Sequence, residues 1–360
     1  MVNPIQGCPN RCKYCFLQSV DGTGIRPIEI IKESDVISEI KKSKYYTPSI
    51  PLCFFSQTDI FSIPSNVEYL KRLLMLIRKT DIKNPLVFIT KCSICDEIIE
   101  ILQEMILEGF KILFYLSYSG LDSTIEGNIK EETIQNNFIK LSAANIPIIH
   151  YFRPLIPLNA SRKRIDEIIS FVSNYSIASV VAGLKIETAY QEKLDFWPEI
   201  VEGEDYTNAE CVWPKGVRDV LKEYGLKYDY PIFETNTCAL SLALGTEERY
   251  GFYNSAPCKC FNNCPKKMRE KCEKVSLRNI QRNENDIRTP LIKLLKLIKK
   301  EVLDLQIELN DGLLQIKNVP LSNEDICFLS GELHIRINCT EKIMGRYWNT
   351  SVNNKTGVEL

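Results

Sequence analysis

The chain has 360 residues and 44% of them are hydrophobic, enough to bury a large core in one barrel with an appendage. A net charge of −1 gives no overall basic field, so we do not expect non-specific binding to nucleic acid. No run of about 18 apolar residues is present, and we expect no membrane-spanning helix. The chain has fourteen cysteines, and clusters among them have metal-ligand spacing; with no room for a signal peptide before the first of them, they favour a cytoplasmic protein.

Three cysteines lie on one short stretch near the start of the chain. Cys8, Cys12 and Cys15 are separated by three and then two residues, and no further cysteine follows until Cys53. Three thiolates on one loop can hold three irons of a [4Fe–4S] cluster, which leaves the fourth iron open to a non-protein ligand. A bare pattern of this kind is also compatible with a zinc site or a ferredoxin fragment.

This motif, followed by Phe16, resembles the radical S-adenosylmethionine (SAM) superfamily. The wider run from Asn3 to Cys15 is similar, more narrowly, to the spore photoproduct lyase-like branch. The resemblance implies a [4Fe–4S] cluster whose open iron takes the amino and carboxylate groups of SAM. It also implies an electron donor such as flavodoxin or ferredoxin.

Short apolar segments alternate with segments of helical periodicity, which predicts β–α units. The predicted strands are Val2–Gln6, Pro51–Phe55, Leu86–Thr90, Ile112–Ser117, Ile146–Phe152 and Ser179–Ile186. Helical spacing lies between them at residues 67–77, 98–105, 134–141 and 165–172. Six such units predict a parallel sheet and match the partial (β/α)6 TIM-like barrel of the superfamily, over residues 1–190.

The active site of such a fold lies at the carboxyl ends of the strands. After the second strand comes Ser56-Gln57-Thr58-Asp59, which resembles a SAM-lining turn of the lyase-like branch, with Ile60 in place of its proline. The resemblance therefore implies that Ser56, Thr58 and Asp59 line the SAM pocket. Thr58 and Asp59 are also suited to capping the helix that follows.

The next two strand ends carry Lys91 and Ser117. In the resemblance the lysine reaches the SAM carboxylate, which suits a point charge, and the serine contacts SAM. The alternatives are a surface lysine and a serine that bonds only to backbone.

The resemblance extends to three further positions. Arg153 belongs to a proline-fixed turn after the fifth strand that also occurs in the family. At Gly183 a missing side chain would let adenine approach the sixth strand. Tyr14 is placed beside the cluster, where it either packs or touches adenine.

His150 lies within an apolar strand, and we expect a hydrogen-bonded core histidine there.

Residues 191–285 form a cysteine-rich extension. Five cysteines fall within 35 residues, and they include a CxC and a Cys-Pro: Cys238, Cys258, Cys260, Cys264 and Cys272. A metal is the leading explanation, either a second [4Fe–4S] cluster or a structural zinc. Four ligands would suffice for either, so one cysteine is spare.

Residues 286–360 read as a small α+β unit. Leu291, Leu294, Leu295, Ile298 and Val302 make an apolar helical stripe, and the strands Leu305–Leu309 and Leu313–Ile316 flank an Asn-Asp-Gly turn typical of a hairpin. Residues 334–338 are expected to add a third strand. The pattern assigns this unit no function.

The sequence favours a radical SAM enzyme whose substrate is a nucleotide or nucleic acid, as the lyase resemblance implies. One alternative is a radical SAM enzyme that acts on a small metabolite or peptide. The other is a non-catalytic iron–sulfur protein for electron transfer or sensing.

Overall fold

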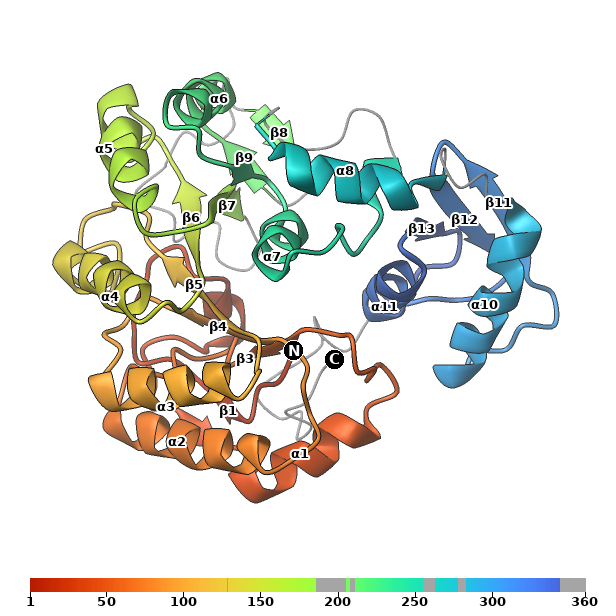
Figure 1. The fold of residues 1–360 in the computed structure, drawn as a ribbon, viewed down its shortest axis with the longest axis horizontal. Coiled ribbons are helices and arrows are strands. Elements are labelled where there is room, and N and C mark those ends of the chain that lie inside the picture. Colours follow the sequence, from red (N-terminus) through yellow and green to blue (C-terminus); the bar gives the residue numbers. More distant parts are fainter. Residues whose placement is uncertain (128, 186–204, 208–210, 255–262, 278–282, 344–360) are drawn as a thin grey trace.

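The computed structural model describes residues 1–127, 129–185, 205–207, 211–254, 263–277 and 283–343 (Figure 1). Its centre is a sheet of parallel strands joined by helices. The strands are β3 (Leu52–Phe54), β4 (Leu86–Thr90), β5 (Ile112–Ser117), β6 (Ile148–Leu155) and β7 (Ala178–Lys185). The connecting helices are α2 (Pro64–Arg78), α3 (Asp96–Leu107), α4 (Glu131–Ala143) and α5 (Arg162–Val172). Neighbours in sequence are neighbours in the sheet, so the predicted β–α alternation is confirmed.

The sheet continues beyond β7 in two ways. The short strand β10 (Ile232–Phe233) pairs in parallel with the first half of β7. At its far end β9 (Cys211–Trp213) pairs antiparallel, and β8 (Asp205–Thr207) follows. The helix that follows β9 is α6 (Val217–Lys227).

The predicted first barrel strand, Val2–Gln6, is wrong in its pairing. Only Val2 bridges Phe54 in parallel, whereas β1 (Ile5–Gln6) pairs antiparallel with β2 (Ile28–Glu29). Pro4 lies between them and has no N–H to donate to a ladder on β3, which accounts for the interruption. The chain then passes through α1 (Glu33–Lys42), a helix that the periodicity did not predict.

The two faces of the sheet have different coverings. Helices α2 to α5 cover one face, and Phe54, Phe88, Phe114 and Phe152 pack there in the largest apolar cluster. On the other face lie α7 (Asn236–Leu244) and α8 (Lys266–Val275) of the cysteine-rich extension. The extension therefore packs directly on the sheet.

The C-terminal unit has its own core. Strands β11 (Gln306–Asn310), β12 (Leu313–Lys317) and β13 (Arg336–Cys339) form one sheet, with α10 (Glu284–Leu297) and α11 (Asn323–Leu333) beside it. The predicted hairpin turns through Asp311 and Gly312, both with positive φ. Asp325 of α11 is buried and accepts hydrogen bonds from Lys44 and Tyr45 after α1, at 3.1 and 2.8 Å. Within the described residues no helix has the length and apolar character needed to cross a membrane.

His150 confirms its expected place in the core. It is fully buried on β6, with Nδ1 2.7 Å from Ser179 Oγ and Nε2 2.8 Å from the carbonyl oxygen of Tyr118. Burial lowers its pKa to about 4 despite the hydrogen bond to that carbonyl. The folded protein therefore holds this ring neutral at a pH where an unfolded histidine is already protonated.

This difference predicts a pH-dependent stability. Between about pH 6.5 and pH 4 the unfolded chain binds the extra proton, so the free energy of unfolding should fall as pH falls, by about 3 kcal/mol in all. Urea titrations at a series of pH values measure this slope. In His150→Gln the His150 contribution to the slope should vanish. His334→Gln, at the other histidine, should keep it, and an unchanged slope in His150→Gln would contradict the assignment.

Candidate functional site

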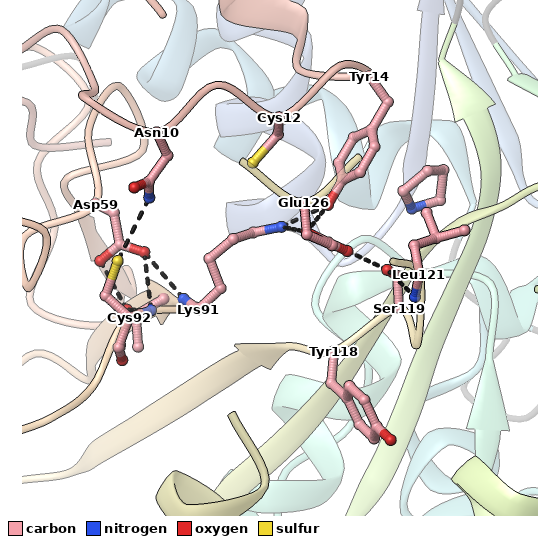
Figure 2. Close-up of polar contacts among 12 residues, drawn as sticks. Asn10, Cys12, Tyr14, Asp59, Lys91, Cys92, Tyr118, Ser119, Leu121 and Glu126 are labelled. Carbon is pink, nitrogen blue, oxygen red and sulfur yellow. Dashed lines mark hydrogen bonds and ion pairs between the residues drawn. The ribbon is translucent and has the colours of Figure 1, made fainter. Parts of the chain in front are cut away.

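The cysteine loop, residues 8–15, lies at the carboxyl ends of the parallel strands (Figure 2). Cys8 N donates to the Gly22 carbonyl at 2.8 Å, and the loop runs into a short 3₁₀ helix at Phe16–Val20. Gln18 of that helix donates to the carbonyl oxygens of Cys12 and Lys13, at 2.8 and 2.7 Å. These bonds fix the backbone that presents the thiols.

The three thiols are shielded from water. Cys8 and Cys12 are buried and Cys15 is half-buried. Burial raises the pKa of Cys8 to about 11 and that of Cys15 to about 12. Burial also raises the pKa of Cys12, with the charge of Lys91 opposing it. A bound positive centre would offset this cost of forming thiolates here.

Three thiols on one loop are the donor set of an iron–sulfur cluster. No group of three or more Cys, His, Asp or Glu side chains in the described parts of the chain is placed to hold a single metal ion. In a cubane each thiolate binds a different iron, so its ligands need not converge on one point. The donor chemistry of the loop therefore fits such a cluster.

Asp59 connects the ends of β3 and β4. Its Oδ1 accepts from Phe61 N at 3.1 Å and from the Thr90 hydroxyl at 2.7 Å. Its Oδ2 accepts from Lys91 N at 2.9 Å and from Cys92 N at 3.3 Å. All four acceptor positions of this buried carboxylate are used. Asp59 thus sets the direction in which the chain, and Lys91 with it, leaves β4.

The Lys91 side chain runs from that point toward the cysteine loop (Figure 2). Its ammonium donates to Glu126 Oε2 and to the Tyr14 hydroxyl. Burial alone would lower the pKa of Lys91, but the neighbouring charge of Glu126 prevails and holds it well above its usual value. This buried position beside the cysteine loop agrees with the prediction that Lys91 lies at the site and not on the surface.

Glu126 is a site residue that the sequence reasoning missed. It is 2% exposed; its Oε2 accepts from the Tyr14 hydroxyl at 2.5 Å as well as from Lys91, and its Oε1 accepts from the Ser119 hydroxyl. It lies in the loop after β5, far along the chain from Tyr14 and Lys91. No spacing signal announces such a residue; only its place after a strand end could have suggested it.

The other predicted residues are placed as follows. Ser56 is held by Asn3, whose Oδ1 accepts from its N and Oγ at 2.8 and 3.0 Å. Among the described residues, the Thr58 hydroxyl and Asn3 Nδ2 have no hydrogen-bond partner although both are buried. Ser117 is buried at the end of β5, paired in register with Tyr151.

Arg153 and Gly183 contact the chain's own side chains and backbone. Arg153 lies on β6, stacked 4.8 Å over the Tyr151 ring and bonded to its hydroxyl. A Cβ at Gly183 would lie 2.0 Å from the Val212 carbonyl oxygen. The missing side chain therefore admits β9, and the physical reason that we gave for an adenine contact applies to that strand instead.

The described late cysteines come together on the sheet. Cys238, Cys264 and Cys272 are buried in one cluster with Leu113 and Tyr115 of β5, among others. Glu248 N donates to Cys272 Sγ at 3.4 Å. Cys258 and Cys260 lie outside the described residues, so their part in a ligand set stays a prediction.

The four hydrogen bonds to Asp59 predict that replacing this carboxylate with an amide destabilises the folded protein. In Asp59→Asn an NH₂ group faces backbone N–H donors, which leaves buried donors unpaired and should lower the free energy of unfolding by about 1–3 kcal/mol. Urea denaturation measures it. Asp122→Asn is the control, because that exposed carboxylate accepts from Thr124 N at 2.7 Å. Equal losses in the two variants would contradict the role given to Asp59.

No protein-family model matches the chain, and no curated protein sequence matches it. Among solved structures, a doubly substituted spore photoproduct lyase with bound AdoMet and dinucleoside spore photoproduct aligns with a TM-score of 0.50. The two are 14% identical, and the alignment covers 63% of this chain and 72% of that one. The lyase complexed with dinucleoside spore photoproduct gives a TM-score of 0.48 at 15% identity, over 63% and 72% of the two chains.

SuiB of Streptococcus suis, bound to S-adenosylmethionine, is more distant, with a TM-score of 0.40 at 16% identity over 52% of this chain and 41% of that one. At sequence identities this low, structural similarity is evidence for the fold alone. The first alignment, with a TM-score of 0.50, is the one that we use for the fold. The chain has the mixed α/β fold of spore photoproduct lyase, which confirms the resemblance drawn from the sequence at the level of the fold.

Proposed function

We propose that the protein is a radical SAM enzyme. The observation that carries this proposal is the three-cysteine loop at the carboxyl edge of a parallel sheet, with Lys91 buried beside it. The shared fold of spore photoproduct lyase, a structure with bound AdoMet, supports it. In the same proposal the parallel strands curve as a partial barrel whose mouth is this edge.

Cys8, Cys12 and Cys15 would hold the [4Fe–4S] cluster, and Lys91 would meet the SAM carboxylate with Tyr14 and Thr58 near it. Bound there, the cluster and SAM would supply reductive SAM cleavage to methionine, with a 5′-deoxyadenosyl radical as the agent that abstracts hydrogen from substrate. The chain's own contribution is to orient groups and to limit water: Asp59 directs Lys91, and Cys8 and Cys12 are buried.

For the substrate we propose a nucleotide or nucleic acid. The support is fold-level analogy with the lyase that binds a dinucleoside photoproduct. The near-neutral charge of the chain argues for local contacts rather than a long basic track. A small metabolite or peptide is the alternative substrate class. A flavodoxin or ferredoxin would supply the electron, in the reducing cytoplasm.

We also propose a second metal site in the extension, an iron–sulfur cluster in preference to zinc. Three of its predicted ligands are buried together on the face of the sheet that α7 and α8 cover, where a cluster could relay an electron or help to hold substrate. Zinc there would only brace the fold.

The first test removes the cysteine loop's ligands. After anaerobic reconstitution, replacing Cys8, Cys12 and Cys15 with alanine should remove about four irons per chain and abolish formation of 5′-deoxyadenosine on reduction. Iron analysis and chromatography of the reaction measure the two. Cys339→Ala, in the core of the C-terminal unit, should change neither. Undiminished SAM cleavage in the triple variant would refute the proposal, and cluster without cleavage in the wild type would favour a non-catalytic iron–sulfur protein.

The second test identifies the other metal. Anaerobically purified protein should contain about eight irons per chain if both sites hold cubes, or about four irons and one zinc in the alternative. Replacing Cys238, Cys264 and Cys272 together should remove only the metal of the extension, which is about four of the eight irons or the one zinc. If the metal content is unchanged in that variant, the extension holds no metal.

A further inference from the structure

We propose that Glu126 is a positioning residue that fixes the Lys91 ammonium beside the cysteine loop. The inference rests on the proposed function only in what Lys91 is positioned for, a ligand carboxylate. It assigns to the loop after β5 a part in the site that neither the motif nor the fold likeness assigns.

The loop of residues 120–127 is fastened to the cysteine loop through backbone. Cys12 and Glu126 form an antiparallel bridge, and Lys13 N donates to the Ile125 carbonyl at 3.0 Å. Gly127 lies so close that a Cβ would come within 2.6 Å of Arg11 N. These contacts leave the backbone at residue 126 little freedom relative to the cysteines.

Apolar packing anchors the same loop at its other side. Leu121 and Ile125 are buried with Ile156 and Leu184, near the carboxyl ends of β6 and β7, and Tyr14 packs against this group. The Glu126 carboxylate therefore projects inward from a segment held on two sides. Its orientation is set before any ligand arrives.

The carboxylate in turn orients three side chains. Lys91 and Tyr14 both donate to Oε2, and Ser119 donates to Oε1. The side chain of Lys91 is 12% exposed and that of Glu126 is 3% exposed. A flexible four-carbon stem ending in a buried charge needs such a partner, because an unpaired ammonium in that environment is strongly disfavoured. Without Glu126 the lysine would leave for solvent.

Two readouts test this, and the first needs no cofactor. In the cluster-free protein, brief acetylation followed by mass spectrometry should modify Lys91 at least tenfold faster in Glu126→Ala than in wild type. The second readout is affinity: reconstituted Glu126→Ala should bind S-adenosylhomocysteine at least tenfold more weakly, with iron content unchanged. Glu126→Gln, which keeps the shape and the hydrogen-bond acceptor, should restore part of both.

Glu131→Ala is the matched control. Glu131 is also a carboxylate held by a tyrosine and a cation, Tyr118 and Arg164, but it begins α4, on the face of the sheet that α2 to α5 cover. It should leave both readouts unchanged. In a Lys91→Ala background, the further change Glu126→Ala should not weaken S-adenosylhomocysteine binding any more. The reason is that Glu126 acts on the ligand through Lys91, which is already absent.

The outcomes separate the two proposals. Unchanged acetylation of Lys91 in Glu126→Ala overturns the positioning role, as does an affinity that is unchanged or higher. Loss of iron together with affinity makes Glu126 a structural support of the cysteine loop and also overturns it. If wild-type protein fails to bind S-adenosylhomocysteine, the proposed function fails, while the acetylation rates still decide whether Glu126 holds Lys91.

Discussion

The buried contact between Lys91 and Glu126 is the interaction on which the polar edge of this protein depends. It joins the end of β4 to the loop after β5, and that loop is fastened by backbone to the cysteines. Tyr14, from the cysteine loop itself, completes the set. Three segments far apart in the sequence thereby become one rigid group. Burying a charge pair of this kind costs desolvation free energy, so the pair adds little to stability. What it contributes is the fixed relative position of the three segments.

The same edge shows how local charge is balanced. Glu126 compensates Lys91, and the four donors around Asp59 compensate its carboxylate. Neither group is left to attract an arbitrary ion from solvent. The cysteine loop, by contrast, contains buried thiols whose pKa burial raises. The site thus combines fixed, satisfied charges with buried thiols, which in the proposed function would become thiolates beside a positive centre.

The two proposed metal sites lie on one body. The extension packs its cysteines against Leu113 and Tyr115 of β5, the strand whose following loop holds Glu126. The C-terminal unit is joined elsewhere, through Asp325 to the segment after α1. The sheet is therefore the common support of both sites, whereas the C-terminal unit contacts both the loop after α1 and residues 249–254 of the extension.

The sequence by itself determined the features that arise within short stretches: the cysteine spacing, the apolar strands from β3 to β7, the helical faces between them and the Asp-Gly hairpin. These follow from periodicity and turn chemistry, which neighbouring residues specify. Only the tertiary structure decided that Pro4 breaks the first strand away from β3, that β9 fills the space at Gly183, and that Glu126 meets Lys91. Each of those depends on contacts between residues distant in sequence, and a burial cost or a steric clash of that kind exists only once the chain has folded.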